Sequence, residues 1–247
     1  MIPEKIKSLW IIANMKNNIL FSLIILLLSA SSSWATQIKY AFKPGASYEY
    51  ELSSSSRSTS RALDKSFADN TAGKAINFTL KVIDFHKGAF IVDIKINDRT
   101  LRRYIKENGD IAGAPGETGK QIPFFLSFPT NDWQPGEKHL VNRPINLGRI
   151  SVPANWNILL KSVDNDKEIA EIWFTANARL PEDKLRKKDF SLKGKLSFDM
   201  ANGIINSAEW STEYNFSFIN KEIAVTRNLW NFTDKSIYSL RLVNIKE

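Results

Sequence analysis

Residues 190–218 read FSLKGKLSFDMANGIINSAEWSTEYNFSF. In the first half of this stretch, apolar residues alternate with serine, lysine and aspartate, and the second half repeats the alternation after Asn202-Gly203. Successive side chains of a β-strand point to opposite faces of a sheet, so each half is predicted to be a strand with one apolar face. Asn-Gly between two such segments is a turn signal. The stretch therefore predicts a β-hairpin and an antiparallel fold.

The alternation also predicts how this hairpin is paired. A two-residue Asn-Gly turn would place Ala201 opposite Ile204 and turn the two apolar faces away from each other. A three-residue loop, Ala201 to Gly203, restores the agreement and gives Gly203 a positive φ. The predicted pairs are Met200–Ile204, Phe198–Asn206, Leu196–Ala208 and Gly194–Trp210.

Two further hairpins have the same predicted loop length. One runs from Ile76 to Ile96 around His86-Lys87-Gly88, and the other from Trp156 to Ala176 around Asp164-Asn165-Asp166. The expected pairs are Val82–Val92 and Leu80–Ile94 in the first, and Leu160–Ala170 and Ile158–Ile172 in the second. Pro-Gly turns precede both hairpins, at Lys43-Pro44-Gly45 and Trp133-Gln134-Pro135-Gly136. This repetition suggests an internal duplication with its midpoint near residues 123–136.

The remaining segments complete an all-β reading. The serine tract Ser53–Ser60 is either an extended edge strand or a loop, and Leu180–Asp189 is either one or two turns of helix or a basic linker. Ile223–Phe232 and Ile237–Val243 are expected as two closing strands. The fold class is all-β, or β with one short helix: an antiparallel sheet of roughly ten to twelve strands, shaped as a half-barrel or open barrel.

The N-terminus has the pattern of an export signal. The apolar block Ile19–Leu28 follows Lys16, and Ser33-Trp34-Ala35 suits a signal peptidase, so residues 1–35 are predicted to be a signal peptide cleaved after Ala35. Met15 is an alternative start. Residues 36–247 are predicted to form a single β domain, without an integral membrane span after cleavage.

Composition excludes several kinds of chemistry. The 247 residues include no cysteine, which rules out disulfides, thiolate metal sites and a lipid-modified cysteine. The two histidines, His86 and His139, lie in no H-x-H or H-E-x-x-H pattern, so no metal site is expected. No cofactor is expected either. The net charge of +8, with a basic cluster that includes Arg102 and Arg103, suits anionic lipid headgroups or a solvated surface better than nucleic acid.

Short motifs resemble a known group of proteins. The pattern F-D-x-x-N-G-x-I from Phe198 to Ile205, with the Pro-Gly turns before strands and a late tryptophan, resembles uncharacterised secreted β-rich proteins of Gram-negative bacteria. An exported, curved antiparallel sheet with a basic rim resembles the periplasmic lipoprotein-carrier half-barrels in architecture. Neither resemblance implies particular site residues.

Three functions remain open from the sequence. The first is a non-enzymatic, periplasmic or secreted envelope protein that binds a lipidic or apolar ligand on a concave sheet face. The second is an interaction module that pairs with an envelope protein through a sheet edge or through the face of Trp173. The third is a secreted hydrolase, which requires His86 or His139 beside a serine and a carboxylate. The candidate binding residues are Trp156, Phe174, Trp210, Tyr214, Arg102 and Arg103.

Overall fold

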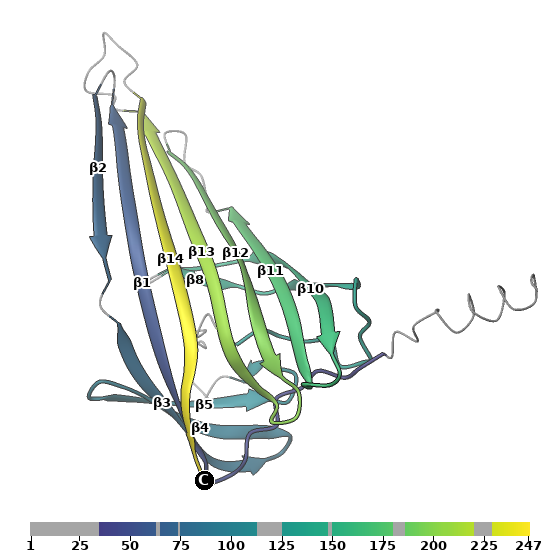
Figure 1. Cartoon of the computed structure of the whole chain (residues 1–247). Coiled ribbons are helices and arrows are strands. Elements are labelled where there is room, and N and C mark those ends of the chain that lie inside the picture. Colours follow the sequence, from purple (N-terminus) through teal and green to yellow (C-terminus); the bar gives the residue numbers. More distant parts are fainter. Residues whose placement is uncertain are drawn as a thin grey trace, which may run out of the picture. The chain divides into compact units, whose positions relative to one another are not determined.

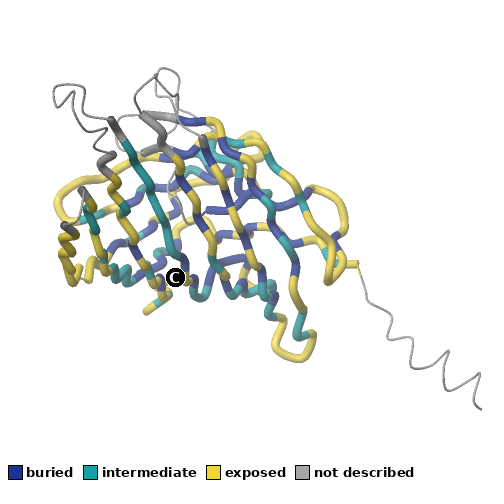
Figure 2. The backbone as a smooth tube through the Cα atoms, turned by 90° about the horizontal axis from the view of Figure 1, so that it is seen from above, coloured by how far each residue is buried: buried dark blue, intermediate teal, exposed yellow. Residues whose placement is uncertain are grey.

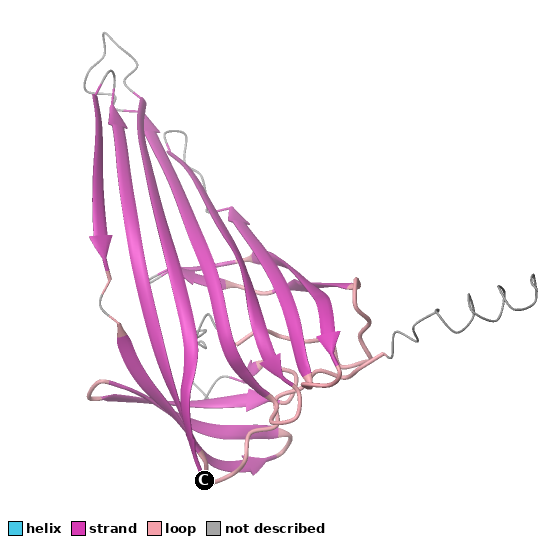
Figure 3. Ribbon diagram, viewed as in Figure 1, coloured by secondary structure: helices cyan, strands magenta, loops and turns pink. Residues whose placement is uncertain are grey.

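The structure of the protein is a computed structural model that describes residues 35–62, 65–73, 75–112, 125–147, 150–179, 186–219 and 229–247. These residues belong to one compact unit, Ala35–Glu247. They form strands, turns and loops and contain no helix (Figure 3). Among them, consequently, no helix is long and apolar enough to cross a membrane. The predicted signal peptide up to Trp34 lies outside the described residues.

Fourteen strands follow one another along the described chain. They are β1 (Ser47–Ala62), β2 (Lys65–Ala72), β3 (Ile76–His86), β4 (Ala89–Ile96), β5 (Arg99–Lys106), β6 (Ile111–Ala112), β7 (Lys138–Asn142), β8 (Ile145–Leu147), β9 (Ile150–Val152), β10 (Ala154–Asp164), β11 (Ile169–Arg179), β12 (Arg186–Asp199), β13 (Ile204–Ile219) and β14 (Leu229–Lys246).

Twelve of these strands form one antiparallel sheet (Figure 1). Its order is β6-β5-β4-β3-β1-β14-β13-β12-β11-β10-β7, and β2 pairs with β1 above β3. The order ends at β6 and β7, which do not pair with each other in the described part of the chain, so the sheet stays open. The predicted antiparallel, half-barrel class is confirmed. The first and last strands, β1 and β14, lie side by side in the middle of the sheet and are paired over their whole length.

One face of the sheet carries the core. Buried residues alternate with more exposed ones along much of β10, β11 and β12, and Figure 2 shows such banding across the sheet. Two segments without regular structure cross the buried face, Ile38–Phe42 and Phe125–Trp133. Tyr40 is fully buried, and its ring contacts four others, those of Phe42, Phe125, Phe128 and Phe198. We call this face the inner face and the opposite one the outer face.

Backbone hydrogen bonds hold the crossing segments in place. Tyr40 N donates to Glu107 O (2.7 Å), and Ala41 N donates to Gly203 O (3.1 Å). Phe128 N donates to Asn108 O (2.7 Å). The small hairpin β8–β9 lies behind β13 and β14 in Figure 1, and it contributes buried Ile145 and Val152 to the core.

The central hairpin confirms half of its predicted register. Leu196 faces Ala208 and Gly194 faces Trp210, as expected, and Gly203 has φ of 61°. The three-residue loop is wrong. The loop has four residues, Met200 to Gly203, so Asp199 faces Ile204 and Phe198 faces Ile205.

The carboxylate of Asp199 explains the longer loop. It accepts hydrogen bonds from Asn202 N (2.9 Å) and Asn202 Nδ2 (2.8 Å). The loop therefore begins at Met200, one residue earlier than the predicted start at Ala201. Asn206 becomes a bulge that restores the register further along. The bulge turns both Ile204 and Ile205 into the core, although strict alternation from Ile204 would turn Ile205 outward.

The other two hairpins also depart from the three-residue loop. In β3–β4 the loop is Lys87-Gly88, with φ of 51° and 75°, and a bulge at Ile83 preserves the predicted pairs Val82–Val92 and Leu80–Ile94. In β10–β11 the loop is longer and Lys161 is a bulge, so Leu160 faces Ile172 instead of Ala170. Ile158 correspondingly faces Phe174 instead of Ile172.

Three other expectations need correction. Ser53–Ser60 is strand, but it is not at an edge, because β14 and β2 flank it. The helix alternative fails for Arg186–Asp189, which is strand, while residues 180–185 lie outside the described part. The two closing strands are one continuous strand, β14, from Leu229 onward, and residues 220–228 are not described.

Candidate functional site

The inner face continues above the core along the upper halves of β13 and β14. Alternation places five aromatic side chains there, and we call them the inner wall: Trp210, Tyr214, Phe216, Phe232 and Tyr238. Trp210 faces Tyr238 across the strand pair, and Phe216 faces Phe232. The wall follows directly from the period of two in this stretch of sequence.

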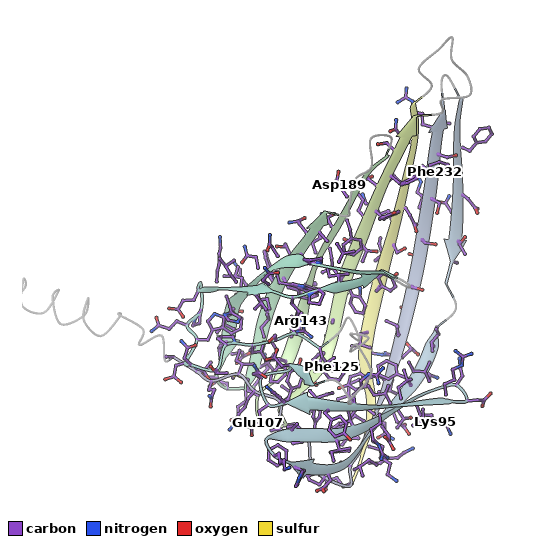
Figure 4. The ribbon with its side chains drawn as sticks, turned by 180° about the vertical axis from the view of Figure 1, so that it is seen from behind. Lys95, Glu107, Phe125, Arg143, Asp189 and Phe232 are labelled. Carbon is purple, nitrogen blue, oxygen red and sulfur yellow. The ribbon has the colours of Figure 1, made fainter. Side chains whose placement is uncertain are left out.

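Ring contacts organise the inner wall. The rings of Trp210 and Tyr238 stack with centroids 5.1 Å apart and planes at 11°. The rings of Phe216 and Phe232 lie 6.2 Å apart at a tilted angle. Exposure increases up the wall, from 5% for Trp210 to 37% for Phe232, with Tyr214 and Phe216 half-buried. Figure 4 shows Phe232 near the upper end of the long strands.

The strand beside the inner wall supplies hydroxyl groups. Ser54, Ser56, Ser58 and Ser60 of β1 stand on the inner-face parity and pair with Tyr238, Ser236, Asp234 and Phe232 of β14. Ser58 Oγ donates to Asp234 Oδ1 (3.3 Å). The serine tract, which the sequence left open between strand and loop, is thus the polar flank of an aromatic surface.

Gly194 brings two of the predicted residues together. A Cβ at Gly194 would lie 2.6 Å from both Phe174 Cζ and Trp210 Cβ. Phe174 therefore reaches across β12 toward Trp210, and both side chains are buried. Tyr214 lies four residues beyond Trp210 on the same face of β13, opposite Phe190.

Trp156 has a structural contact at the margin of this surface. Its indole Nε1 donates to Arg143 O (3.1 Å), and Arg143 N donates to Ala154 O (3.0 Å). These bonds attach the chain leading into β8 to the start of β10. Trp156 is buried with Phe174, so both support the inner wall from the core side.

Arg102 and Arg103 lie elsewhere. They belong to β5, and β4, β3, β1 and β14 separate that strand from β13. Arg102 makes a two-point ion pair with Asp93 (2.7 and 2.8 Å), which holds the pKa of that carboxyl below its ordinary value. Arg103 is buried, and its Nη1 donates to Arg102 O (2.7 Å). The structure does not join these two arginines to the aromatic candidates.

A polar cluster inside the fold was not foreseen. Asp110 accepts hydrogen bonds from Ser127 Oγ and from Asn108 Nδ2 (2.9 Å). Burial tends to raise the pKa of Asp110, but these bonds and the charge of Arg143 more than offset it and hold the pKa below the ordinary value. Burial lowers the pKa of His139, which the negative charge of Asp110 partly offsets. Asp110 N also donates to Asn108 Oδ1 (3.1 Å), so the turn Asn108-Gly109 fixes the position of Asp110.

This cluster bears on the hydrolase hypothesis. It contains a serine, a carboxylate and a histidine, but Ser127 donates to Asp110 directly. No hydrogen bond within the described ranges joins His139 or His86 to a serine. His139 instead lies with its ring 6.5 Å from that of Trp133. A base positioned against a serine nucleophile is therefore not seen in the described residues.

Metal binding has no clear site in the described chain. Over those residues, no three or more histidine, aspartate or glutamate side chains gather as a metal would require.

Comparisons with known proteins include a likeness to a solved structure. No family model matches the chain. No curated protein matches it. A solved structure of lipid–protein interactions in lipovitellin is similar to this chain with a TM-score of 0.42 and 12% sequence identity, over 83% of this chain and 26% of that one. The chain thus spans about a quarter of the length of that protein.

Proposed function

We propose that the protein is a non-enzymatic binding protein that holds the apolar part of a lipid against the inner wall. The observation that carries the proposal is the partial exposure of four rings above the buried core of the inner face, those of Tyr214, Phe216, Phe232 and Tyr238. Contiguous apolar surface that a fold leaves open marks an interaction site. Rings of this size each offer about 150–250 Å² of area to bury.

The neighbouring polar groups indicate an amphipathic ligand. Serine hydroxyls of β1 and the Asp234 carboxylate lie on the same face as the rings. They can hydrogen-bond a hydroxyl or ammonium group, while an acyl chain lies along the aromatic side chains. A lipid whose head carries an ammonium group, zwitterionic or cationic, suits this surface better than a free fatty acid, because Asp234 attracts the ammonium and repels a carboxylate.

The open sheet suits reversible binding. A surface bounded by free strand edges can accept a chain from the side without unfolding, and the ligand leaves by the same route. Nothing in this scheme requires a chemical step, so the proposed role is to carry or retain the lipid.

Lipid binding is tested with purified full-length chain and two kinds of measurement. The first is mass spectrometry of an organic extract of the purified protein, in which we expect phospholipid. The second is titration with a fluorescent phosphatidylethanolamine. The double variant Phe216→Ser/Phe232→Ser is expected to weaken binding about tenfold or more, equivalent to about 1.4 kcal/mol.

Ile237→Ser is the matched control for this test. Ile237 lies on the same strand as Phe232, but it is 57% exposed on the outer face. The control should bind lipid as the wild type does. Protein free of lipid that also fails to bind the probe, or equal binding by the control and the double variant, would overturn the proposal.

We also propose that the protein works outside the cytoplasm, in the periplasm or in secreted form. The apolar block Ile19–Leu28, which follows Lys16, and the cleavage pattern Ser33-Trp34-Ala35 support this location. Sequencing the N-terminus of protein isolated from cells should find Thr36 as the first residue. A retained Met1 or Met15 would contradict export by cleavage.

A second candidate function is assembly through the edge of β2. This strand pairs with β1 alone in the described chain, and Phe67 is 63% exposed. Gly73 N donates to Ser54 O (2.8 Å), so the odd-numbered residues of β2 bond to β1 and the even-numbered ones direct N–H and C=O groups outward. Such an edge can receive an extended strand from a partner.

Ala68→Pro tests this second function. It removes one outward N–H without touching a β1–β2 hydrogen bond. Crosslinking in intact cells should lose its protein adducts in Ala68→Pro and keep them in Asp69→Asn, a change on the same strand. Adducts that persist in the proline variant would contradict an assembly role for this edge.

A further inference from the structure

The outer face carries a polar hollow that the inner wall does not explain. Its volume is about 500 Å³. Nine residues of β7 and β10–β13 and their junctions line it: Asn142, Pro153, Asn155, Asn177, Ala178, Asp189, Phe190, Ser191 and Asn215. The side chains of Ala178 and Phe190 are buried on the inner face, so the strand backbone forms the floor there.

Four of the polar residues stand in one row across the strands. Asn142 pairs with Asn155, Asn155 with Asn177, and Asn177 with Ser191. Their neighbours Trp156 and Leu192 are buried, so the row points outward. Four strands at a spacing of about 4.8 Å make the row roughly 14 Å long.

A second row closes the hollow at one side. Asp189 pairs with Asn215, and Figure 4 shows Asp189 in the upper part of the sheet. Asn215 is fixed, because its Oδ1 accepts from Thr233 Oγ1 (2.8 Å) and its Nδ2 donates to Glu213 Oε1 (3.2 Å). Within the described chain no hydrogen bond engages the side chains of Asn142, Asn155 and Asn177, all of which are exposed. Their amides are open to a ligand.

The chemistry of the lining restricts the class of ligand that can bind in the hollow. The described lining consists of amide, hydroxyl and apolar side chains and the carboxylate of Asp189. These groups suit a ligand rich in hydroxyls better than an anionic one, because a carboxylate repels anions. One carboxylate alone is a poor site for a metal ion. The described side chains that point into the hollow are mostly amides, with a hydroxyl and a carboxylate, and these polar groups disfavour the acyl chain of a lipid.

A neutral ligand that carries many hydroxyl groups fits the amides, the hydroxyl and the carboxylate of this lining. Each asparagine amide offers two donors and one acceptor oxygen, and each sugar hydroxyl is both a donor and an acceptor. The Asp189 carboxylate can accept two further hydroxyl hydrogen bonds. An extended row of such groups matches a ligand whose hydroxyls recur along its length.

We propose that this hollow is a binding site for a neutral oligosaccharide, which lies across β7, β10, β11 and β12 on the outer face. The site is separate from the inner wall, because the two occupy opposite faces of the same sheet. It does not depend on lipid binding, and each can be lost without the other.

The test uses the purified full-length chain and four probes: maltohexaose, cellohexaose, mannohexaose and chitohexaose. Isothermal titration should show that at least one of them binds with a dissociation constant of about 1 mM or tighter. Asn155→Ala/Asn177→Ala is expected to weaken that binding at least tenfold. Ser191→Trp, which fills the hollow, should abolish it.

Asn70→Ala is the matched control, because Asn70 is an exposed asparagine on the outer parity of β2 and lies outside the hollow. This variant and Phe216→Ser/Phe232→Ser should bind the sugar as the wild type does. Thermal unfolding and circular dichroism confirm that each variant is folded. The proposal is overturned if none of the four hexasaccharides binds, or if Asn155→Ala/Asn177→Ala binds as tightly as Asn70→Ala. Binding that EDTA abolishes would also overturn it, by assigning the site to a metal ion.

Discussion

At Gly194, β12 is in close contact with both of its neighbouring strands, β11 and β13. An added Cβ would lie 2.5 Å from Glu209 O and 2.6 Å from Phe174 Cζ and Trp210 Cβ. Two of these neighbours belong to backbone or to the base of a side chain, so they cannot move aside by a rotamer change. The glycine is required by space, since its φ is not positive.

Gly194→Ala should therefore destabilise the fold by about 1–3 kcal/mol, the usual cost of forcing extra volume into a packed region. Urea unfolding followed by tryptophan fluorescence measures the change. Lys195→Ala is the control, because Lys195 is exposed on the next position and forms only a surface ion pair with Glu209 (3.2 Å). An unchanged midpoint in Gly194→Ala would show that Trp210 does not lie over this strand.

Asp110 links the stability of the fold to pH. Its pKa is lower in the folded protein than in the unfolded chain, where it is about 3.9. The unfolded state therefore binds the proton more strongly, so the stabilisation is present above pH about 4 and is lost as the pH falls through the folded pKa. The pKa of His139 is also lowered in the folded protein, so the unfolded chain binds this proton more strongly. Its contribution to stability therefore begins to fall at a higher pH, as the pH drops below about 6.5.

Asp110→Asn is expected to flatten the pH dependence below pH about 5. It also lowers stability at neutral pH, because its amide oxygen accepts from Ser127 without a negative charge and its NH2 group faces the Asn108 Nδ2 donor. Melting temperatures from pH 7 to pH 2 provide the test. Asp69→Asn, an exposed carboxyl on β2, should leave the wild-type slope. Parallel slopes for wild type and Asp110→Asn would contradict the assignment.

Bulges set the register of the hairpins. Ile83, Lys161 and Asn206 are each an extra residue in one strand of a hairpin, and Val243 is a fourth in β14. A bulge shifts the parity of every later residue, so loop length cannot be deduced from matching apolar faces alone. The three-residue loops were inferred by requiring apolar residues to face each other across each hairpin. In the structure a bulged residue in one strand meets that requirement, so the loops have other lengths.

Strand β2 should be the least protected strand of the described sheet. It pairs on one side, and its described side chains are exposed on both faces. Hydrogen exchange by NMR should find fast exchange at Ser66, Ala68 and Asn70, whose N–H groups point outward, and slow exchange at Ala208 in β13. Slow exchange at Ala68 in a dilute sample would show that a second chain already covers this edge.

The whole molecule is held together by segments that are not strands. Ile38–Phe42 crosses the inner face and makes backbone bonds to the turns at Glu107 and Gly203. Tyr40 stacks on Phe128 at 5.3 Å and meets Phe198 edge-on at 5.3 Å. Burial raises the pKa of its hydroxyl, as expected for a ring enclosed by the core.

Tyr40→Ala should lower the free energy of unfolding by about 3–5 kcal/mol, in the range for removing a large buried ring. Chemical denaturation measures it, and Lys39→Ala, the exposed neighbour, should change the free energy by less than about 0.5 kcal/mol. A small effect at Tyr40 would mean that the crossing segment is not part of the cooperative fold.

The sequence by itself determined the class of the fold and the faces of its strands. Alternation depends only on neighbours along the chain, which is why Trp210 over Gly194, Val82 opposite Val92 and the outward direction of Trp173 were predicted correctly. The aromatic residues Trp210 and Tyr214 could be named for the same reason.

Only the tertiary structure decided which strands are neighbours and what gathers on each face. The pairing of β1 with β14, the Asp110–Ser127 contact and the asparagine row each join residues from distant parts of the chain. Their association depends on long-range strand order and on bulges, which local periodicity does not encode. The same physics separated Arg102 and Arg103 from the aromatic wall, although composition alone had grouped them.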